Sequence, residues 1–341
     1  GKTKYVPGKG TPELQKAIQR KFKEDNNINY QLDEIICGVG GKHIIYNAMM
    51  ATINPGDEVI ITAPFWVSYP DIVLLAEGKP VIVECPQSQN FKITPEQLDK
   101  NINSNTKWLM LNSPSNPTGS VYSKKELEDL AHILKKYPNV LIMCDDIYEK
   151  IIYDELDFHT LASIEPSLKE RCLTLNGVSK SYCMTGWRLG YCGAPKEIIA
   201  AMNKIQSQST TSTSSITMAA AVEAISGPQD FIKEHNEKFL KRRDLVLNKL
   251  NNIDGITCQK PEGAFYVYPN CEGIIGKKTP NGSQISNDED FMTYLLEDQG
   301  VAGVHGAAFG LSPYFRLSYA TSDAVLEDAC NRIKEACNKL T

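Results

Sequence analysis

The stretch Cys172-Leu173-Thr174-Leu175-Asn176-Gly177-Val178-Ser179-Lys180 contains a short apolar run, then Asn-Gly, then a lysine. The run predicts a buried strand that ends at Asn176-Gly177. Six similar runs recur along the chain, at residues 34–39, 58–62, 80–84, 107–112, 140–145 and 189–194. Strands that are apolar throughout and alternate with helices indicate an α/β fold. We expect a mainly parallel seven-stranded sheet with helices on both faces.

The helices are predicted from amphipathic segments at residues 42–53, 66–77, 94–101 and 123–137. After Pro195 the pattern changes. A long helical stretch from about 228 to 250 precedes short strands at 264–268 and 315–319, with helices at 288–299 and 323–340. We expect a large domain over residues 1–227 and a small α+β domain over 228–341. Residues 207–217 are expected to form an ordered polar loop, and 270–290 a surface loop.

Composition excludes several classes of protein. The chain has 341 residues, a net charge of -5 and a pI near 5.7, so it carries no basic footprint for nucleic acid. No apolar run is long enough to span a membrane. The ten cysteines include no C-x-x-C pair, and several lie in strand-like runs, which favours a reducing, cytoplasmic compartment and no metal site. The sequence starts at Gly1 without a methionine, which leaves a preceding targeting segment open.

Lys180 stands at the end of a predicted buried strand, and Arg188 follows eight residues later. A desolvated lysine loses its proton readily and becomes a nucleophile toward carbonyls. Arginine offers a forked cation for phosphate. Together they suggest an amine that captures a phosphate-bearing aldehyde cofactor, which describes pyridoxal phosphate. A surface loop with two ordinary cations explains this segment alone equally well.

Unusual residues cluster where the predicted strands end. Ligands of open α/β sheets bind beyond the carboxyl ends of the strands. Five loops follow such ends and would converge on one rim, and they contain residues 38–42, 63–66, 113–119, 145–148 and Lys180.

Several of these residues have both a functional and a structural interpretation. Gly41 and Lys42 open a helix whose N-terminus favours an anion, although a plain turn also explains the glycines. Asp145 ends an apolar strand, where a protonated pyridine nitrogen or a structural partner would satisfy its carboxylate. Tyr148 could donate to a ring oxygen or simply pack, and Trp66 could stack on a flat ring or belong to the core.

Two further polar residues have the same ambiguity. Asn116 lies in a Ser-Asn-Pro turn, where asparagine often caps its own backbone. Arg316 lies in the alternating run Tyr314-Phe315-Arg316-Leu317-Ser318-Tyr319. It suits bidentate carboxylate binding, or it is a solvent-facing cation on an edge strand.

Taken together, these motifs support a family resemblance. The chain resembles the class I, fold type I pyridoxal-phosphate aminotransferases, most closely the aspartate aminotransferase branch typical of bacteria. The matching segments span nearly the whole chain in the right order, at residues 1–5, 39–42, 64–70, 112–119, 145–149, 176–190, 263–266 and 315–319.

The resemblance implies a role for each candidate residue. Lys180 is the catalytic residue, linking covalently to the cofactor and moving the substrate proton. Around the cofactor ring, Asp145 would contact the nitrogen, Tyr148 and Asn116 the ring oxygen, and Trp66 the ring face. The phosphate would be held by Arg188 with the backbone of Gly41 and Lys42. Tyr5 would contact the phosphate of the partner subunit's cofactor. The substrate contacts are Arg316 on the α-carboxylate and Lys42 on a distal carboxylate, beside Trp66 and Asn116.

The resemblance implies a homodimeric aspartate aminotransferase that moves the amino group of L-aspartate to 2-oxoglutarate, giving oxaloacetate and L-glutamate. An aromatic, prephenate or broad-range aminotransferase is the nearest alternative. The chain departs from the family pattern at Cys183, where a smaller residue is usual, which we expect to perturb packing. Family members also carry several dozen residues before the position of Gly1, so a truncated, cofactor-binding but inactive protein is another alternative.

A nucleotide-binding dehydrogenase is the rival from another enzyme class, because Gly38-Val39-Gly40-Gly41 follows a strand. His43 occupies the third glycine position of the dinucleotide fingerprint, however. That alternative also leaves Lys180 and Asp145 without a function.

Overall fold

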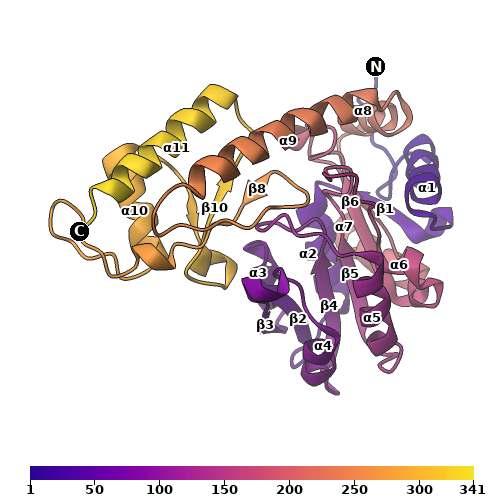
Figure 1. Ribbon diagram of the computed structural model, residues 1–341. Coiled ribbons are helices and arrows are strands. Elements are labelled where there is room, and N and C mark those ends of the chain that lie inside the picture. The colour runs from indigo at the N-terminus through magenta and orange to yellow at the C-terminus, as the bar shows by residue number, and fades with distance from the viewer.

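A computed structural model describes residues 1–341, and its largest element is a seven-stranded sheet (Figure 1). The strand order is β1-β7-β6-β5-β4-β2-β3. Neighbours from β6 to β3 are parallel, and β7 is antiparallel to both β6 and β1. The strands are β1 (Ile35–Gly38), β2 (Glu58–Ala63), β3 (Lys79–Glu84), β4 (Thr106–Asn112), β5 (Leu141–Asp145), β6 (Cys172–Gly177) and β7 (Gly190–Gly193). The predicted mainly parallel seven-stranded sheet is confirmed.

Helices cover both faces of this sheet. One face packs against α2 (Gly41–Thr52), α3 (Ser68–Leu75) and α7 (Lys196–Gln208). The other packs against α1 (Pro12–Asn26), α4 (Pro95–Asn101), α5 (Lys124–Leu134), α6 (Leu161–Ile164) and α8 (Ser215–Ser226). Successive residues of β4 alternate between the two cores, with Trp108 and Met110 in one and Leu109 and Leu111 in the other. Most strands are therefore apolar throughout because both faces are buried, whereas the edge strand β3 is mostly exposed or half-buried.

The C-terminal part has its own core around a second, three-stranded antiparallel sheet of order β8-β10-β9. Its strands are β8 (Tyr266–Val267), β9 (Val304–His305) and β10 (Phe315–Ser318), and its helices are α9 (Asp230–Leu250), α10 (Asp288–Gln299) and α11 (Asp323–Asn338). The long helix α9 runs from beside α8 toward α11 and joins the two parts (Figure 1). Tyr148, Ile151 and Tyr153, which follow β5, also belong to the C-terminal core.

The prediction of a loop over residues 207–217 was wrong at both ends. Helix α7 continues to Gln208, and α8 begins at Ser215. Serine and threonine are weak helix formers, but burial of Met218 and Ala221 in the core that α8 shares with α1 outweighs that propensity. The short strand β9 was not predicted, because two residues give no periodicity to read. No helix combines the length and apolar character that a membrane-spanning segment needs.

Candidate active site

A cavity of about 330 Å³ opens at the carboxyl ends of the parallel strands. Nine of the ten predicted site residues line it: Gly41, Lys42, Trp66, Asn116, Asp145, Tyr148, Lys180, Arg188 and Arg316. The tenth, Tyr5, lies away from the cavity with 96% of its surface exposed. The structure therefore brings together residues from five strand-end loops and from β10, as the sequence pattern predicts.

The charges on the cavity wall are unequal. Lys42, Lys180, Arg188 and Arg316 line it, and Asp145 is the only acidic residue among the lining side chains. None of the four cations forms an ion pair with an aspartate or glutamate of the chain. A concave surface with surplus positive charge concentrates anions. The site is therefore suited to a ligand with several negative charges.

Asp145 is buried at the end of β5. Tyr69 donates a hydrogen bond from its hydroxyl to Asp145 Oδ2 at 2.6 Å, and the backbone N–H of Ile147 donates to Oδ1 at 3.3 Å. Burial raises the pKa of Asp145 to about 6, while these two donors and the charge of Lys180 oppose the rise. A carboxylate with so few partners can accept a further cationic donor from the cavity.

Lys180 follows β6 and is half-buried beside two aromatic rings. Its Nζ lies 5.6 Å from the ring centroid of Tyr148 and 5.7 Å from that of Phe265. Burial lowers the pKa of Lys180, the charge of Asp145 opposes this, and the cations Arg316 and Arg188 add to the lowering. The amine therefore loses its proton more readily than an exposed lysine, which a nucleophile or a proton carrier requires.

Arg316 is held in a fixed direction by three neighbours. Its Nη1 donates to Asn116 Oδ1 at 2.8 Å, and its guanidinium carbon lies 4.7 Å from the ring centroid of Tyr266 and 4.9 Å from that of Phe309. The amide of Asn112 in turn accepts from the Asn116 backbone at 2.7 Å. An arginine oriented by two aromatic faces presents its remaining donors to the cavity as a carboxylate receptor.

The N-terminus of α2 and Arg188 form a cradle on the cavity wall. Gly40 precedes the helix with φ 86° and supplies no side-chain cap. A Cβ at Gly40 would lie 2.2 Å from Arg188 Nη2, and a Cβ at Gly190 would lie 2.4 Å from the backbone nitrogen of Gly41. Glycine is therefore required at both positions. The uncapped helix N-terminus beside a guanidinium matches the chemistry of phosphate binding.

Lys42 and Tyr148 complete the wall. The Lys42 ammonium is exposed and lies 4.9 Å from the ring centroid of Trp66. The hydroxyls of Tyr148 and Tyr266 are 3.0 Å apart, and burial raises the pKa of both tyrosines. Both phenols therefore stay protonated at neutral pH. One donates to the other, and the hydroxyl that accepts keeps its own proton to donate into the cavity.

The turn that carries Asp145 and Tyr148 is anchored from behind by a buried ion pair. Lys21 of α1 pairs with Glu149, and both side chains are almost fully buried. Asn26 accepts from Lys21 Nζ at 2.6 Å and donates to Glu149 Oε2 at 2.8 Å. Every charged atom of the pair thus has a partner, which a buried ion pair needs to be stable.

Sequence reasoning gave no role to Tyr69, Tyr266 or the Lys21–Glu149 pair. Tyr69 could have been found from its spacing, because the helix predicted over 66–77 would place it on the same face as Trp66, although α3 begins only at Ser68. Its ring stands at 88° to that of Trp66, with centroids 5.5 Å apart. Cys183 is exposed with φ 54°, and its Sγ lies 3.9 Å from His235 Nδ1.

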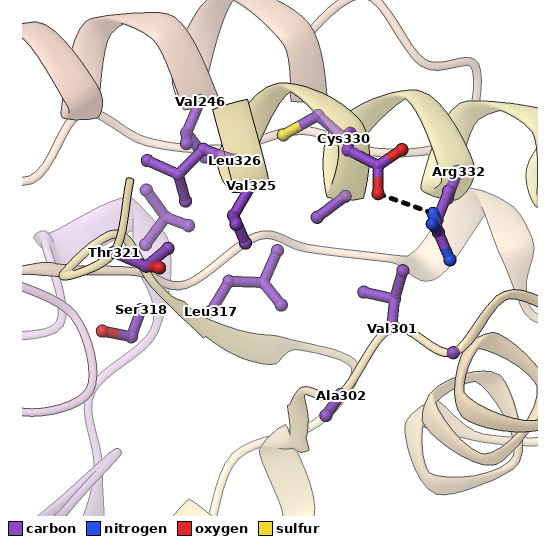
Figure 2. Close-up of a pocket in the computed structure, with 14 residues that line it drawn as sticks. Val246, Val301, Ala302, Leu317, Ser318, Thr321, Val325, Leu326, Cys330 and Arg332 are labelled. Carbon is purple, nitrogen blue, oxygen red and sulfur yellow. Dashed lines mark ion pairs between the residues drawn. The ribbon is translucent and has the colours of Figure 1, made fainter. Parts of the chain in front are cut away.

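A larger cavity of about 460 Å³ lies in the C-terminal part, between α9, α11 and β10 (Figure 2). Its wall is mainly apolar, with Val246, Leu317 and Leu326 among the lining residues. Its two charged residues, Asp328 and Arg332, pair with each other at 2.8 Å, as the dashed line in Figure 2 shows. It therefore offers no unpaired charge for chemistry, and the smaller cavity is the candidate active site.

Comparison with known proteins agrees with this assignment. The sequence profile described as "Aminotransferase class I and II" matches residues 1–333. An aspartate aminotransferase of Rhizobium meliloti (strain 1021) is 54% identical over 341 residues, which are 100% of this chain and 83% of the relative. An aspartate/prephenate aminotransferase of Cereibacter sphaeroides is 55% identical over 100% of this chain and 85% of its own length.

Solved structures give the same result. The crystal structure of the Rhizobium meliloti aspartate aminotransferase matches with a TM-score of 0.98 at 54% identity, over 100% of this chain and 85% of that one. The Thermus thermophilus aspartate aminotransferase with maleate matches with a TM-score of 0.91 at 38% identity, over 98% and 84% of the two chains. The chain therefore belongs to the class I and II aminotransferase family and is a pyridoxal-phosphate-dependent aminotransferase.

Proposed function

We propose that this enzyme transfers the amino group of L-aspartate to 2-oxoglutarate, giving oxaloacetate and L-glutamate, with pyridoxal 5′-phosphate held in the strand-end cavity. The observation that carries this proposal is the surplus of four unpaired cations over one carboxylate on the cavity wall. A phosphate and the two carboxylates of a dicarboxylic amino acid supply the matching negative charges. The Thermus thermophilus relative with maleate, itself a dicarboxylate, supports the same substrate class.

The residues present fit the cofactor group by group. The uncapped N-terminus of α2 at Gly41 and Lys42, together with Arg188, would hold the phosphate. Asp145, with a free position on its carboxylate, would pair with the protonated ring nitrogen. The remaining contacts would be Tyr148 and Asn116 on the ring oxygen, Trp66 on the ring face and Lys180 on the aldehyde carbon.

The chain's own residues then divide the chemistry. When bound, pyridoxal phosphate supplies an electron sink for the negative charge left on the substrate Cα. Lys180 Nζ, with its lowered pKa, accepts the proton from that Cα and carries it to the product side. Arg316 holds the α-carboxylate in the direction fixed by Asn116 and two aromatic rings.

Two measurements on the full chain test the proposal. Borohydride reduction of the cofactor-loaded protein is expected to add the mass of the reduced cofactor to the peptide that contains Lys180. Mixing the loaded protein with L-aspartate and 2-oxoglutarate is expected to yield oxaloacetate. Cofactor capture without any oxaloacetate would instead support an inactive, cofactor-binding protein.

An enzyme that also accepts aromatic substrates or prephenate is the second candidate, favoured by the name of the Cereibacter sphaeroides relative. Lys42 separates the two candidates. Lys42→Ala is expected to lower kcat/KM for aspartate about 10- to 100-fold, because one charged hydrogen bond to the distal carboxylate is lost. The kcat/KM for phenylalanine, which has no distal carboxylate, is expected to stay within about twofold.

Lys196 provides a matched control, because it is another exposed lysine in the first turn of a helix. Lys196→Ala is expected to leave kcat/KM unchanged for both aspartate and phenylalanine. Equal losses for aspartate and phenylalanine in Lys42→Ala would show that Lys42 serves the phosphate alone.

We further propose a homodimer with shared sites, in which the exposed Tyr5 reaches the partner subunit's cofactor, and a division into domains 1–227 and 228–341. The exposure of Tyr5 and the start of α9 at Asp230 support these proposals. Sedimentation of the purified chain tests the dimer, and a monomer at working concentration would overturn it.

A further inference from the structure

The Tyr69 hydroxyl makes one hydrogen bond, and its acceptor is Asp145. The Tyr69 side chain is 3% exposed, and its hydroxyl donates to Asp145 Oδ2 at 2.6 Å. The two residues come from separate elements, since Tyr69 lies in the first turn of α3 and Asp145 ends β5. Trp66, three residues before Tyr69 and ahead of the first residue of α3, packs edge-on against the tyrosine ring.

The surroundings of Asp145 leave few other donors. Lys180 faces it from the loop after β6, and Tyr148 faces it from its own turn. The backbone N–H of Ile147 donates to Oδ1 at 3.3 Å, near the long limit for a hydrogen bond. The short bond from Tyr69 is therefore the strongest contact that favours the ionised carboxylate over the neutral acid.

Tyr69 is also a donor that stays protonated. Burial and the charge of Asp145 raise the pKa of Tyr69 well above its usual range. The hydroxyl therefore keeps its proton across the whole working range of pH. It occupies Oδ2 at short range, while Oδ1 has only the long contact from Ile147 and can accept a further donor from a ligand. A fixed donor on one oxygen determines the direction in which the other can accept.

We propose that Tyr69 is a positioning residue that keeps Asp145 ionised and directs its Oδ1 to the ring nitrogen of the bound cofactor. This inference rests on the proposed function, because it acts through the contact between Asp145 and the cofactor. Tyr69 lines the cavity, but its hydroxyl is engaged by Asp145 and would act on the cofactor through that carboxylate.

The effect of removing the hydroxyl follows from the ionisation of Asp145. In Tyr69→Phe the pKa of Asp145 is expected to rise by about one unit above its value of about 6. Only the ionised carboxylate pairs with the protonated ring nitrogen, so the variant binds the cofactor more weakly at low pH. The ratio of dissociation constants, variant to wild type, is expected to grow from about one at pH 9 to about five at pH 6.

The experiment titrates the cofactor-free full chain with pyridoxal phosphate at pH 6 to 9 and follows the visible absorbance. Tyr191→Phe is the matched control, because Tyr191 is fully buried and its hydroxyl has no hydrogen-bond partner. For Tyr191→Phe, the ratio of dissociation constants, variant to wild type, is expected to stay near one at every pH. Tyr69→3-fluorotyrosine keeps the ring and strengthens the donor, so it is expected to favour the ionised acid and improve binding at pH 6.

A cofactor analogue with carbon in place of the ring nitrogen isolates the mechanism. With this deaza analogue, Tyr69→Phe and wild type are expected to bind equally at every pH, because Asp145 has no ring nitrogen to hold. The role of Tyr69 is overturned if the ratio of dissociation constants for pyridoxal phosphate, Tyr69→Phe to wild type, does not change with pH. It is also overturned if the analogue gives the same pH-dependent ratio as pyridoxal phosphate. If the wild type itself fails to bind pyridoxal phosphate, the proposed function fails instead.

Discussion

Lys180→Ala is expected to lower the rate of amino transfer about 10⁴-fold, the largest effect of any single substitution in the chain. The variant loses both the covalent link to the cofactor and the group that moves the proton at the substrate Cα. No other lysine lines the cavity except Lys42, which is exposed near the Trp66 ring. The measurement is single-turnover conversion of aspartate by the cofactor-loaded variant.

Lys180→Arg gives the sharper comparison. The guanidinium keeps the positive charge beside Asp145, but it cannot give up its proton to act as a nucleophile or base. We therefore expect Lys180→Arg to be as inactive as Lys180→Ala, and Lys125→Ala, an exposed lysine paired with Asp129, to be fully active. An active Lys180→Arg would show that Lys180 contributes charge alone.

The sheet could be predicted from the sequence because most of its strands are buried on both faces, the edge strand β3 being the exception. Most strands are apolar runs followed by a helical segment, so the change from one pattern to the other marks where an element ends. The same alternation places Gly41, Asp145 and Lys180 at strand ends. Parallel pairing of β5 with β6 brings Asp145 and Lys180 to one rim. Gly41 reaches the same rim because β1 and β6 both pair antiparallel with β7.

Other parts of the site depend on contacts between distant segments. Asn26 and Glu149 are 123 residues apart, and no local pattern links them. The bond from Tyr69 to Asp145 spans 76 residues and depends on how α3 packs on the sheet. Polar residues at the ends of α7 and α8 concealed those helix ends, because tertiary packing outweighed their propensity.

The cavity also depends on both parts of the chain. Tyr266 and Arg316 come from the three-stranded sheet, while Lys180, Asp145 and Asn116 come from loops of the large sheet. Arg316 meets Asn116 across 200 residues of sequence. A movement of one part relative to the other would therefore change the distance between the carboxylate receptor and the reacting amine.

Arg316→Ala is expected to lower kcat/KM about 10²- to 10³-fold for aspartate and phenylalanine alike. Both substrates carry the α-carboxylate that the Arg316 guanidinium binds. Removal of the guanidinium leaves this carboxylate desolvated and unpaired, so kcat/KM falls for both substrates. This equal loss contrasts with the selective loss expected for Lys42→Ala. Steady-state kinetics with the two amino acids at fixed 2-oxoglutarate measure both effects.

Arg316→Lys separates charge from geometry. Lysine keeps the positive charge but lacks the planar fork that contacts Asn116 and stacks against Tyr266 and Phe309. We expect Arg316→Lys to recover only a minor part of the lost kcat/KM. Arg332→Ala, in the other cavity, is expected to leave kcat/KM unchanged for both amino acids. If Arg316→Ala instead impaired aspartate alone, Arg316 would be the receptor for the distal carboxylate. The assignments of Arg316 and Lys42 would then have to be exchanged.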